Sequence, residues 1–224
     1  MSNENKNNIE LIDGNVKLVF SPETDTGYIK IGEQEVDIDE KILASLSVLT
    51  NIVYVEQGFD GVDLDWEYPG QRAEDNAFRP SDKENFTLLL AEIRKHLKKA
   101  GAADNKDYLL TIATGADQAY IDNTDLGKAQ EFLDFINVMC YDYYHGWHFQ
   151  TGHHANLHPS DKERFNGNSG LEAIGRHIKA GVPSEKLVMG IPFYGRQWEK
   201  VVNKKDGLYQ PANSTGIIVP YWDI

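Results

Sequence analysis

The sequence contains one cysteine, Cys140, and no apolar run of about 18 residues that could cross a membrane as a helix. The lone cysteine excludes a disulfide within the chain and a zinc site built from several cysteines. Basic residues are also in deficit, because 22 Lys and Arg against 35 Asp and Glu give a formal net charge of -13. This charge would repel nucleic acid and anionic membranes, so neither is expected as a partner, whereas a neutral ligand is unaffected.

The start of the chain also lacks the pattern of a secretory signal. Residues 1–8 are polar and have no apolar core of the kind found in a secretory signal, so we expect no signal peptide in this chain. What the chain does have is 224 residues, 41% of them hydrophobic and 11% aromatic. This composition is typical of a globular domain with a sizeable core.

The chain divides into three stretches by pattern. Residues 1–37 form a polar N-terminal segment whose short β-like runs, at 16–20 and 28–31, would fit a small hairpin. Residues 38–198 alternate between strand-like and helix-like patterns. The stretch 199–224 is aromatic and loop-like, and we interpret it as a closing tail or the start of an insertion.

Strand and helix signals alternate along the middle stretch. Helices are predicted at 39–57, from a capping box at Ser81 to Gly101, at 125–133, and from a second capping box at Ser169 to Ala180. Strands are predicted at 59–69, 108–114, 135–141 and 187–194. Apolar strands that alternate with helices indicate a parallel sheet buried on both faces, as in a doubly wound sheet or a barrel of the triosephosphate-isomerase (TIM) type.

The most informative stretch is Phe-Asp-Gly-Val-Asp-Leu-Asp-Trp-Glu-Tyr-Pro at 59–69. Successive side chains of a strand point to opposite faces, so Asp63, Asp65 and Glu67 are expected to share one face. Like charges at that spacing repel one another, which folding alone would not favour and which is typical of sites that use shifted carboxyl pKa values. A calcium loop is an alternative, but such a loop would not interleave Val, Leu and Trp with the acids.

Polar residues also follow the other predicted strands. Glu67, the pair Tyr141 and Asp142, and the pair Tyr194 and Arg196 stand at the carboxyl ends of three strands, where βα barrels build their active sites. Five of the seven histidines lie at 145–158, which suggests a metal, but their spacing fits no standard zinc helix. The nearby aromatic residues fit either core positions or platforms for sugar rings. They are Tyr143, Tyr144, Trp147 and Trp198.

At these residues the sequence resembles the family 18 glycoside hydrolases, specifically the chitinases. The match is the complete Asp-x-x-Asp-x-Asp-x-Glu signature, followed in the family's order by three further motifs. These are Asp60, Asp63, Asp65 and Glu67, then Met139-Cys-Tyr-Asp142, then Gly146-Trp147 with Thr151-Gly-His-His-Ala155, and finally Pro192-Phe-Tyr-Gly-Arg196. The resemblance covers about 39–224 and implies an α/β fold, a partial TIM-type (β/α)8 barrel with four to five recognisable βα units equivalent to the family's fourth to seventh strands.

The resemblance implies retaining hydrolysis of β-1,4-linked N-acetylglucosamine polymers, in which the substrate's acetamido oxygen is the nucleophile. Glu67 would be the general acid, Asp65 would orient the acetamido group, and Asp63 would share a proton with Asp65. Tyr141 would donate a hydrogen bond to the acetamido carbonyl, and Asp142 would hold the sugar at the cleaved bond. The implied substrate-binding residues are Asp60, Tyr68, Met139, Trp147, Tyr194 and Arg196. The implied partner is chitin or a chito-oligosaccharide, without a metal or other cofactor.

The sequence also departs from the family pattern. Upstream of Gly58 we find neither the family's first strand nor its Ser-x-Gly-Gly motif, and we expect these 224 residues to leave no room for the family's eighth strand. We therefore expect that residues 1–37 and the tail close the barrel, that a longer parent chain or another chain supplies the rest, or that this is an inactive fragment. A glycan-binding lectin and an endo-β-N-acetylglucosaminidase are further alternatives, and the retained Glu67 argues against the lectin. Family resemblance implies an extracellular location.

Overall fold

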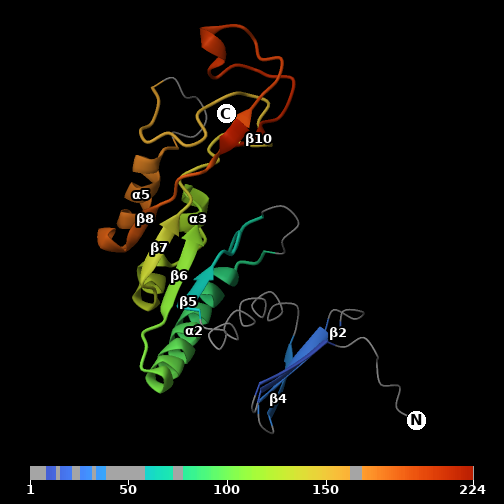
Figure 1. Ribbon diagram of the computed structural model, residues 1–224, viewed down its shortest axis with the longest axis vertical. Coiled ribbons are helices and arrows are strands. Elements are labelled where there is room, and N and C mark those ends of the chain that lie inside the picture. Colours follow the sequence, from blue (N-terminus) through green and yellow to red (C-terminus); the bar gives the residue numbers. More distant parts are fainter. Residues whose placement is uncertain are drawn as a thin grey trace, which may run out of the picture. The chain divides into compact units, whose positions relative to one another are not determined.

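The computed structural model describes residues 59–72, 78–161 and 168–223 in full, together with the backbone of four strands between residues 9 and 38 (Figure 1). The chain divides into two compact units, Met1–Phe59 and Asp60–Ile224, which we describe separately. The helix predicted at 39–57 lies outside the described residues.

The first unit contains a four-stranded antiparallel sheet. Its strands are β1 (Ile9–Asp13), β2 (Val16–Ser21), β3 (Thr26–Ile31) and β4 (Gln34–Ile38), and they are neighbours in chain order. In the register, Leu11 lies opposite Leu18, and Ile29 lies opposite both Leu18 and Val36. The β-like runs at 16–20 and 28–31 fall on β2 and β3, and two further strands extend the pair into a meander. The boundaries drawn at 37 and 198 stay predictions.

The second unit is built on a parallel sheet. It consists of β5 (Gly61–Leu64), β6 (Leu109–Thr114), β7 (Phe135–Val138) and β8 (Leu187–Met189), which lie side by side in chain order (Figure 1). A doubly wound sheet reverses its strand order once, whereas a barrel does not. The uninterrupted order therefore favours the barrel.

Helices follow each of the first three strands. They are α2 (Asp82–Asp104), α3 (Gln118–Asp122), α4 (Leu126–Ala129) with the 3-10 turn Gln130–Phe132, and α5 (Gly170–Lys179), after which a second turn, Ser184–Lys186, leads into β8. These elements match the predicted helices to within a few residues. Helix α3 was not predicted, because five residues are too few to show a helical period.

The two predicted capping boxes have different outcomes. At α5 the Ser169 hydroxyl accepts the N–H of Glu172 at 3.2 Å, as predicted. At α2 the prediction is wrong, because the Ser81 side chain makes no capping bond. Ser81 already has helical backbone angles, φ −69° and ψ −15°, whereas a capping residue needs an extended backbone. The buried carboxylate of Asp82 instead accepts the N–H groups of Arg79 at 2.8 Å and Gly70 at 3.2 Å.

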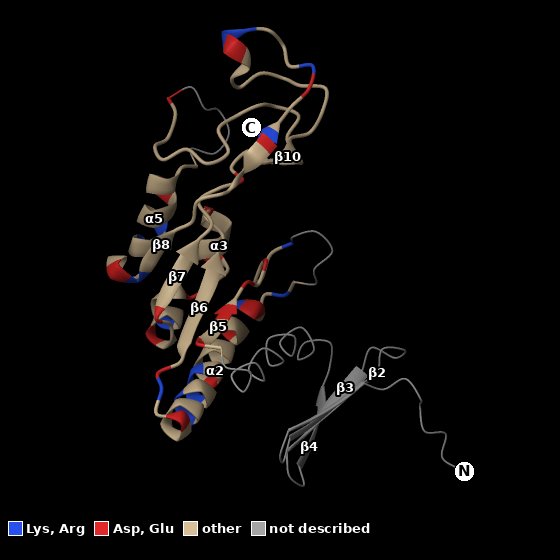
Figure 2. Ribbon diagram, in the orientation of Figure 1, with Lys and Arg blue, Asp and Glu red and all other residues tan. Residues whose placement is uncertain are grey.

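The core lies on one face of the parallel sheet. The side chains of Leu110, Ile112, Ile136 and Val138 are fully buried there, and so is an apolar row on α2. That row consists of Phe86, Leu90, Ile93 and Leu97. Burying each such side chain contributes about 1.5–3 kcal/mol before the entropy of ordering is counted. Strands β6, β7 and β8 carry no charged residue, and β5 carries only Asp63 (Figure 2).

A second, antiparallel sheet follows the parallel one. Tyr194–Gln197 form β9, which pairs with β10 (Ile217–Pro220), and 3-10 turns lie at Lys205–Gly207 and Tyr221–Asp223 (Figure 1). Two predictions are thereby corrected. The strand expected at 187–194 ends at Met189, and the loop-like stretch 199–224 contains a strand. A strand forms where its edge finds a partner, and the partner of β9 lies 20 residues away, beyond the reach of a local pattern.

No described helix combines the length and apolar character needed to cross a membrane.

A buried histidine ties α5 to the parallel sheet. The Nδ1 of His177 lies 2.8 Å from the carbonyl of Ala173, and its Nε2 lies 2.9 Å from the hydroxyl of Thr114. A carbonyl can only accept, so Nδ1 carries the proton and Nε2 accepts from Thr114, which describes a neutral imidazole. Burial lowers the pKa of His177 below its ordinary value of 6.5.

This histidine makes stability depend on pH. Because its pKa is depressed in the folded chain, its contribution is complete above about pH 6.5 and is lost as the pH falls below that value. We expect the free energy of unfolding to decrease between pH 7 and pH 5, and His177→Leu to make this decrease smaller. Urea unfolding at both pH values measures the effect. His96→Gln, at an exposed site on α2, is the control, and equal pH dependence in wild type and His177→Leu would contradict the expectation.

Candidate active site

The acidic row lies at the carboxyl end of β5. The strand itself is shorter than predicted, since Leu64 ends it, but the alternation continues beyond it. Val62 and Leu64 are buried, whereas Asp63, Asp65 and Glu67 are exposed, which confirms that the three acids share one face. The row therefore stands on the face of the sheet opposite the apolar core.

The acids act on one another and on two phenols. Partial burial of the Asp65 carboxyl raises its pKa above the ordinary value, although the residue as a whole is exposed, and the charges of Glu67 and Asp63 raise it further. Burial likewise raises the pKa of Tyr68, as does its hydrogen bond with Glu67. The pKa of Tyr141 is raised by burial and by the charges of Asp65 and Glu67. Both phenols thus stay protonated at neutral pH and keep a hydroxyl that can donate.

Two polar residues from neighbouring strands reach Asp63, and sequence reasoning missed both. The Thr111 hydroxyl on β6 donates to Asp63 Oδ1, and the Asn137 amide on β7 donates to the same oxygen at 3.2 Å. Thr111 and Asn137 are polar residues inside strands that are otherwise mainly apolar and carry no charge. This contrast was the sequence signal that could have identified them.

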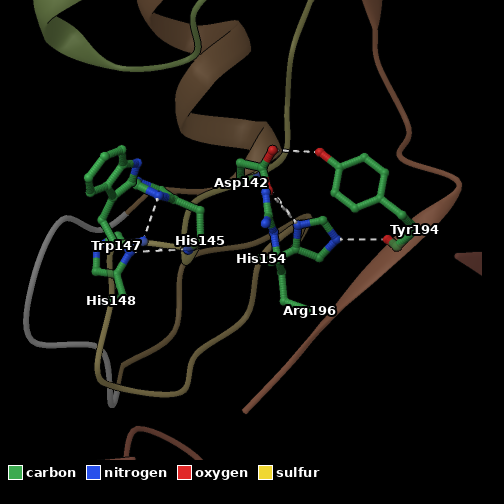
Figure 3. Close-up of polar contacts among 7 residues, drawn as sticks. All are labelled: Asp142, His145, Trp147, His148, His154, Tyr194 and Arg196. Atoms are coloured by element: carbon green, nitrogen blue, oxygen red, sulfur yellow. Dashed lines mark hydrogen bonds and ion pairs between the residues drawn. The ribbon is translucent and has the colours of Figure 1, made fainter. Parts of the chain in front are cut away.

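A second polar cluster surrounds Asp142 (Figure 3). Tyr194 Oη donates to one carboxylate oxygen at 2.5 Å, and Arg196 donates to the other through Nε at 2.8 Å and through Nη2. The guanidinium of Arg196 also lies 5.4 Å from the centre of the Tyr194 ring. The cluster joins the segment after β7 to strand β9, so the predicted residues Asp142, Tyr194 and Arg196 meet.

His154 completes this cluster and was not predicted. Its Nε2 lies 3.1 Å from the Tyr194 carbonyl, and its Nδ1 lies 3.3 Å from the backbone N–H of Asp142 and 3.4 Å from Oδ1 of the same residue. Burial alone would raise the pKa of Asp142, but hydrogen bonds from Tyr194 and Arg196 and the positive charge of Arg196 outweigh it and hold that pKa well below its usual range. Asp142 is therefore an anion at any pH near neutral.

Tyr141 links the two clusters. Its pKa responds to Asp65 and Glu67 on one side and to Asp142 on the other, and its ring packs edge to face on Tyr194 with centroids 6.2 Å apart. Met139 precedes it at the end of β7, where its N–H donates to the Thr114 carbonyl at 3.0 Å. The carboxyl ends of β5 and β7 thus present acids and a phenol to one region.

The histidines before and after Trp147 support a loop. The His145 ring accepts the backbone N–H of Trp147 through Nδ1 at 3.4 Å. The His148 ring accepts the backbone N–H of His145 through Nδ1 at 3.1 Å (Figure 3). Trp198 Nε1 fixes the same loop by donating to the His148 carbonyl at 2.9 Å. The Trp147 side chain itself is 75% exposed. Among the described residues, no group of three or more His, Cys, Asp or Glu is placed to hold a metal.

One predicted site residue lies elsewhere. Asp60 precedes β5, at the amino end of the sheet, where its carboxylate pairs with Lys106 Nζ at 2.7 Å. Glu67 lies seven positions further along the chain, and a strand advances about 3.3 Å per residue, so the two carboxylates cannot contact one sugar. The expectation that Asp60 binds substrate stays a prediction, although the structure places this side chain at the end of β5 opposite Glu67.

Comparison with known proteins identifies the family. The sequence profile described as glycosyl hydrolases family 18 matches residues 27–222. The chain belongs to this family. Among the curated relatives, chitinase A1 from Niallia circulans is 45% identical over 175 residues, which cover 74% of this chain and 24% of that protein.

Solved structures of family 18 members are similar as well. A family 18 N-acetylglucosaminidase from Paenibacillus barengoltzii matches with a TM-score of 0.74 at 41% identity, covering 78% of this chain and 52% of that one. The cell-surface-expressed chitinase ChiW from a Paenibacillus strain matches with a TM-score of 0.73 at 39% identity, covering 79% and 16%. These likenesses confirm the TIM-type barrel, of which this chain contains a part. The chain spans 24% to 36% of the length of the curated relatives that it matches.

Proposed function

We propose that this chain carries the acid catalyst of a chitinase, which cleaves β-1,4-linked N-acetylglucosamine polymers with retention of configuration. The observation that carries the proposal is the row of Asp63, Asp65 and Glu67 at the carboxyl end of β5, beside Tyr141 at the end of β7. Active sites of βα barrels are built at that end. The chitinase names of the family relatives support chitin as the substrate.

The mechanism assigns one role to each of these groups. Glu67 donates its proton to the glycosidic oxygen while the substrate's acetamido oxygen attacks the anomeric carbon and forms an oxazolinium ion. Asp65 orients the acetamido group, and the protonated Tyr141 hydroxyl donates a hydrogen bond to the acetamido carbonyl. Glu67, now a carboxylate, removes a proton from the water that opens the oxazolinium, so two inversions give net retention.

The Asp142 cluster and Trp147 would bind the sugars on either side of the cleaved bond. Asp142 is an anion held by Arg196 and Tyr194, so it offers a fixed acceptor to a sugar hydroxyl. The exposed indole of Trp147 offers an apolar platform of the kind on which sugar rings stack. Tyr68, which follows Glu67, and Met139, two residues before Tyr141, would line the same region.

The test is hydrolysis of N-acetylglucosamine oligosaccharides by the full chain. With a tetrasaccharide substrate, we expect disaccharide products whose new reducing ends form first as the β-anomer, and proton NMR records both. Release of single N-acetylglucosamine units would favour the N-acetylglucosaminidase activity named for the Paenibacillus barengoltzii relative. Binding without any hydrolysis would contradict the enzyme and favour a lectin. We propose an extracellular location, which the cell-surface chitinase among the relatives supports.

A further inference from the structure

The carboxylate of Asp63 is held at one oxygen by two strands. The Thr111 hydroxyl and the Asn137 amide both donate to Oδ1. Thr111 is the register partner of Asp63 on the adjacent strand β6, and Asn137 lies one strand further, on β7. The register partner of Asn137 on β6 is Ala113, whose methyl group is too short to block the amide from reaching across. The arrangement therefore depends on three strands in one register.

The two carboxylate oxygens of Asp63 have different roles, which follow from the chemistry of the donors. An amide nitrogen can only donate, so Oδ1 must act as an acceptor. Hydrogen bonds to a carboxylate favour its charged form, and two donors on Oδ1 leave Oδ2 as the oxygen that can share a proton with Asp65. The titratable groups around the acidic row are Asp65, Glu67 and Tyr68 on the same segment, Tyr141 at the end of β7, and Tyr120 on α3.

The position of the Thr111 hydroxyl argues against a purely structural role. Thr111 is 5% exposed and lies between Leu110 and Ile112, where valine would provide the same β-branched shape without a polar group. Thr114, on the same strand, is also buried, but its hydroxyl points to the opposite face and bonds His177. The strand thus carries one buried hydroxyl for the core and one for the acidic row.

We propose that Thr111 and Asn137 are positioning residues of the hydrolysis, which hold Asp63 through Oδ1 and so keep the shared proton on the side of Asp65. This inference rests on the proposed function. It goes beyond the acidic signature, because neither residue belongs to that motif.

The test is kinetic. We expect Thr111→Val and Asn137→Leu each to lower kcat about tenfold while KM changes less than about twofold, because ground-state sugar contacts are untouched. Without the donors the carboxylate is less favoured, so the acidic limb of the pH profile should move to higher pH, by roughly half a unit or more. Thr111→Ser retains the hydroxyl and should restore both values. Thr114→Val is the matched control, because it removes a buried hydroxyl from the same strand and should leave the profile in place.

A second readout separates this inference from the proposed function. Carboxyl carbon NMR of the aspartate-labelled chain at pH 7 reports the hydrogen bonding of Asp63 without any substrate. A larger change of the Asp63 carboxyl signal in Thr111→Val than in Thr114→Val supports the role of Thr111, even if the wild-type chain hydrolyses nothing. Equal changes of this signal, or equal loss of kcat in Thr111→Val and Thr114→Val, would overturn the inference.

Discussion

Replacing Glu67 with glutamine is expected to lower the rate of oligosaccharide hydrolysis by roughly 10²- to 10⁴-fold, the range attributed to a general acid–base group. Glutamine has nearly the same shape, but it cannot donate a proton to the glycosidic oxygen at neutral pH. The acids Asp63 and Asp65 and the phenol of Tyr141 remain in place, so binding of the oligosaccharide should weaken by less than about tenfold. Turnover of a chromogenic substrate and calorimetric titration of the chain measure the two effects.

The control for this variant is Glu131→Gln, at an exposed position on the turn after α4. It changes the net charge by the same amount and should leave both turnover and binding unchanged. If Glu67→Gln kept more than about a tenth of the wild-type turnover, Glu67 would not be the general acid. If it lost binding as well as turnover, the change would have disturbed the site rather than the proton transfer.

Replacing Asp142 with asparagine is expected to lower the free energy of unfolding of the second unit by about 3 kcal/mol. The Arg196 side chain is only 11% exposed, and without the carboxylate its charge is left without its partner. Breaking a buried pair from one side typically costs about 3–5 kcal/mol, and the partial exposure of Asp142 favours the lower end. All four tryptophans lie in this unit, so urea unfolding followed by tryptophan fluorescence reports on it.

The same variant should change how stability depends on pH. Because the pKa of Asp142 is held below its ordinary value of 3.8, its contribution is present above that pH and is lost as the pH falls further. Asp142→Asn should therefore flatten the acid side of the stability profile. Asp125→Asn, which breaks an exposed pair with Lys128, should cost less than about 1 kcal/mol. Equal losses in the two variants would show that the Asp142 cluster adds no stability of its own.

Local patterns predicted the elements that depend on near neighbours. The strands at 108–114 and 135–141 and the helix after Ser169 were found because their apolar residues repeat at the right period. The same rules failed at Ser81, where the backbone is already helical and the side chain makes no capping bond. They also failed for β10, whose pairing with β9 depends on a contact between residues far apart in the chain.

The sequence by itself determined which acids stand together. A strand places every second residue on one face, so the spacing of Asp63, Asp65 and Glu67 was sufficient to align them. Only the tertiary structure decided what surrounds them. The register of three strands brings Thr111 and Asn137 to Asp63, and the fold of the segment after β7 brings His154 to Asp142. The physical reason is that a side chain's direction follows from its own strand, whereas its hydrogen-bond partners depend on which strands pair.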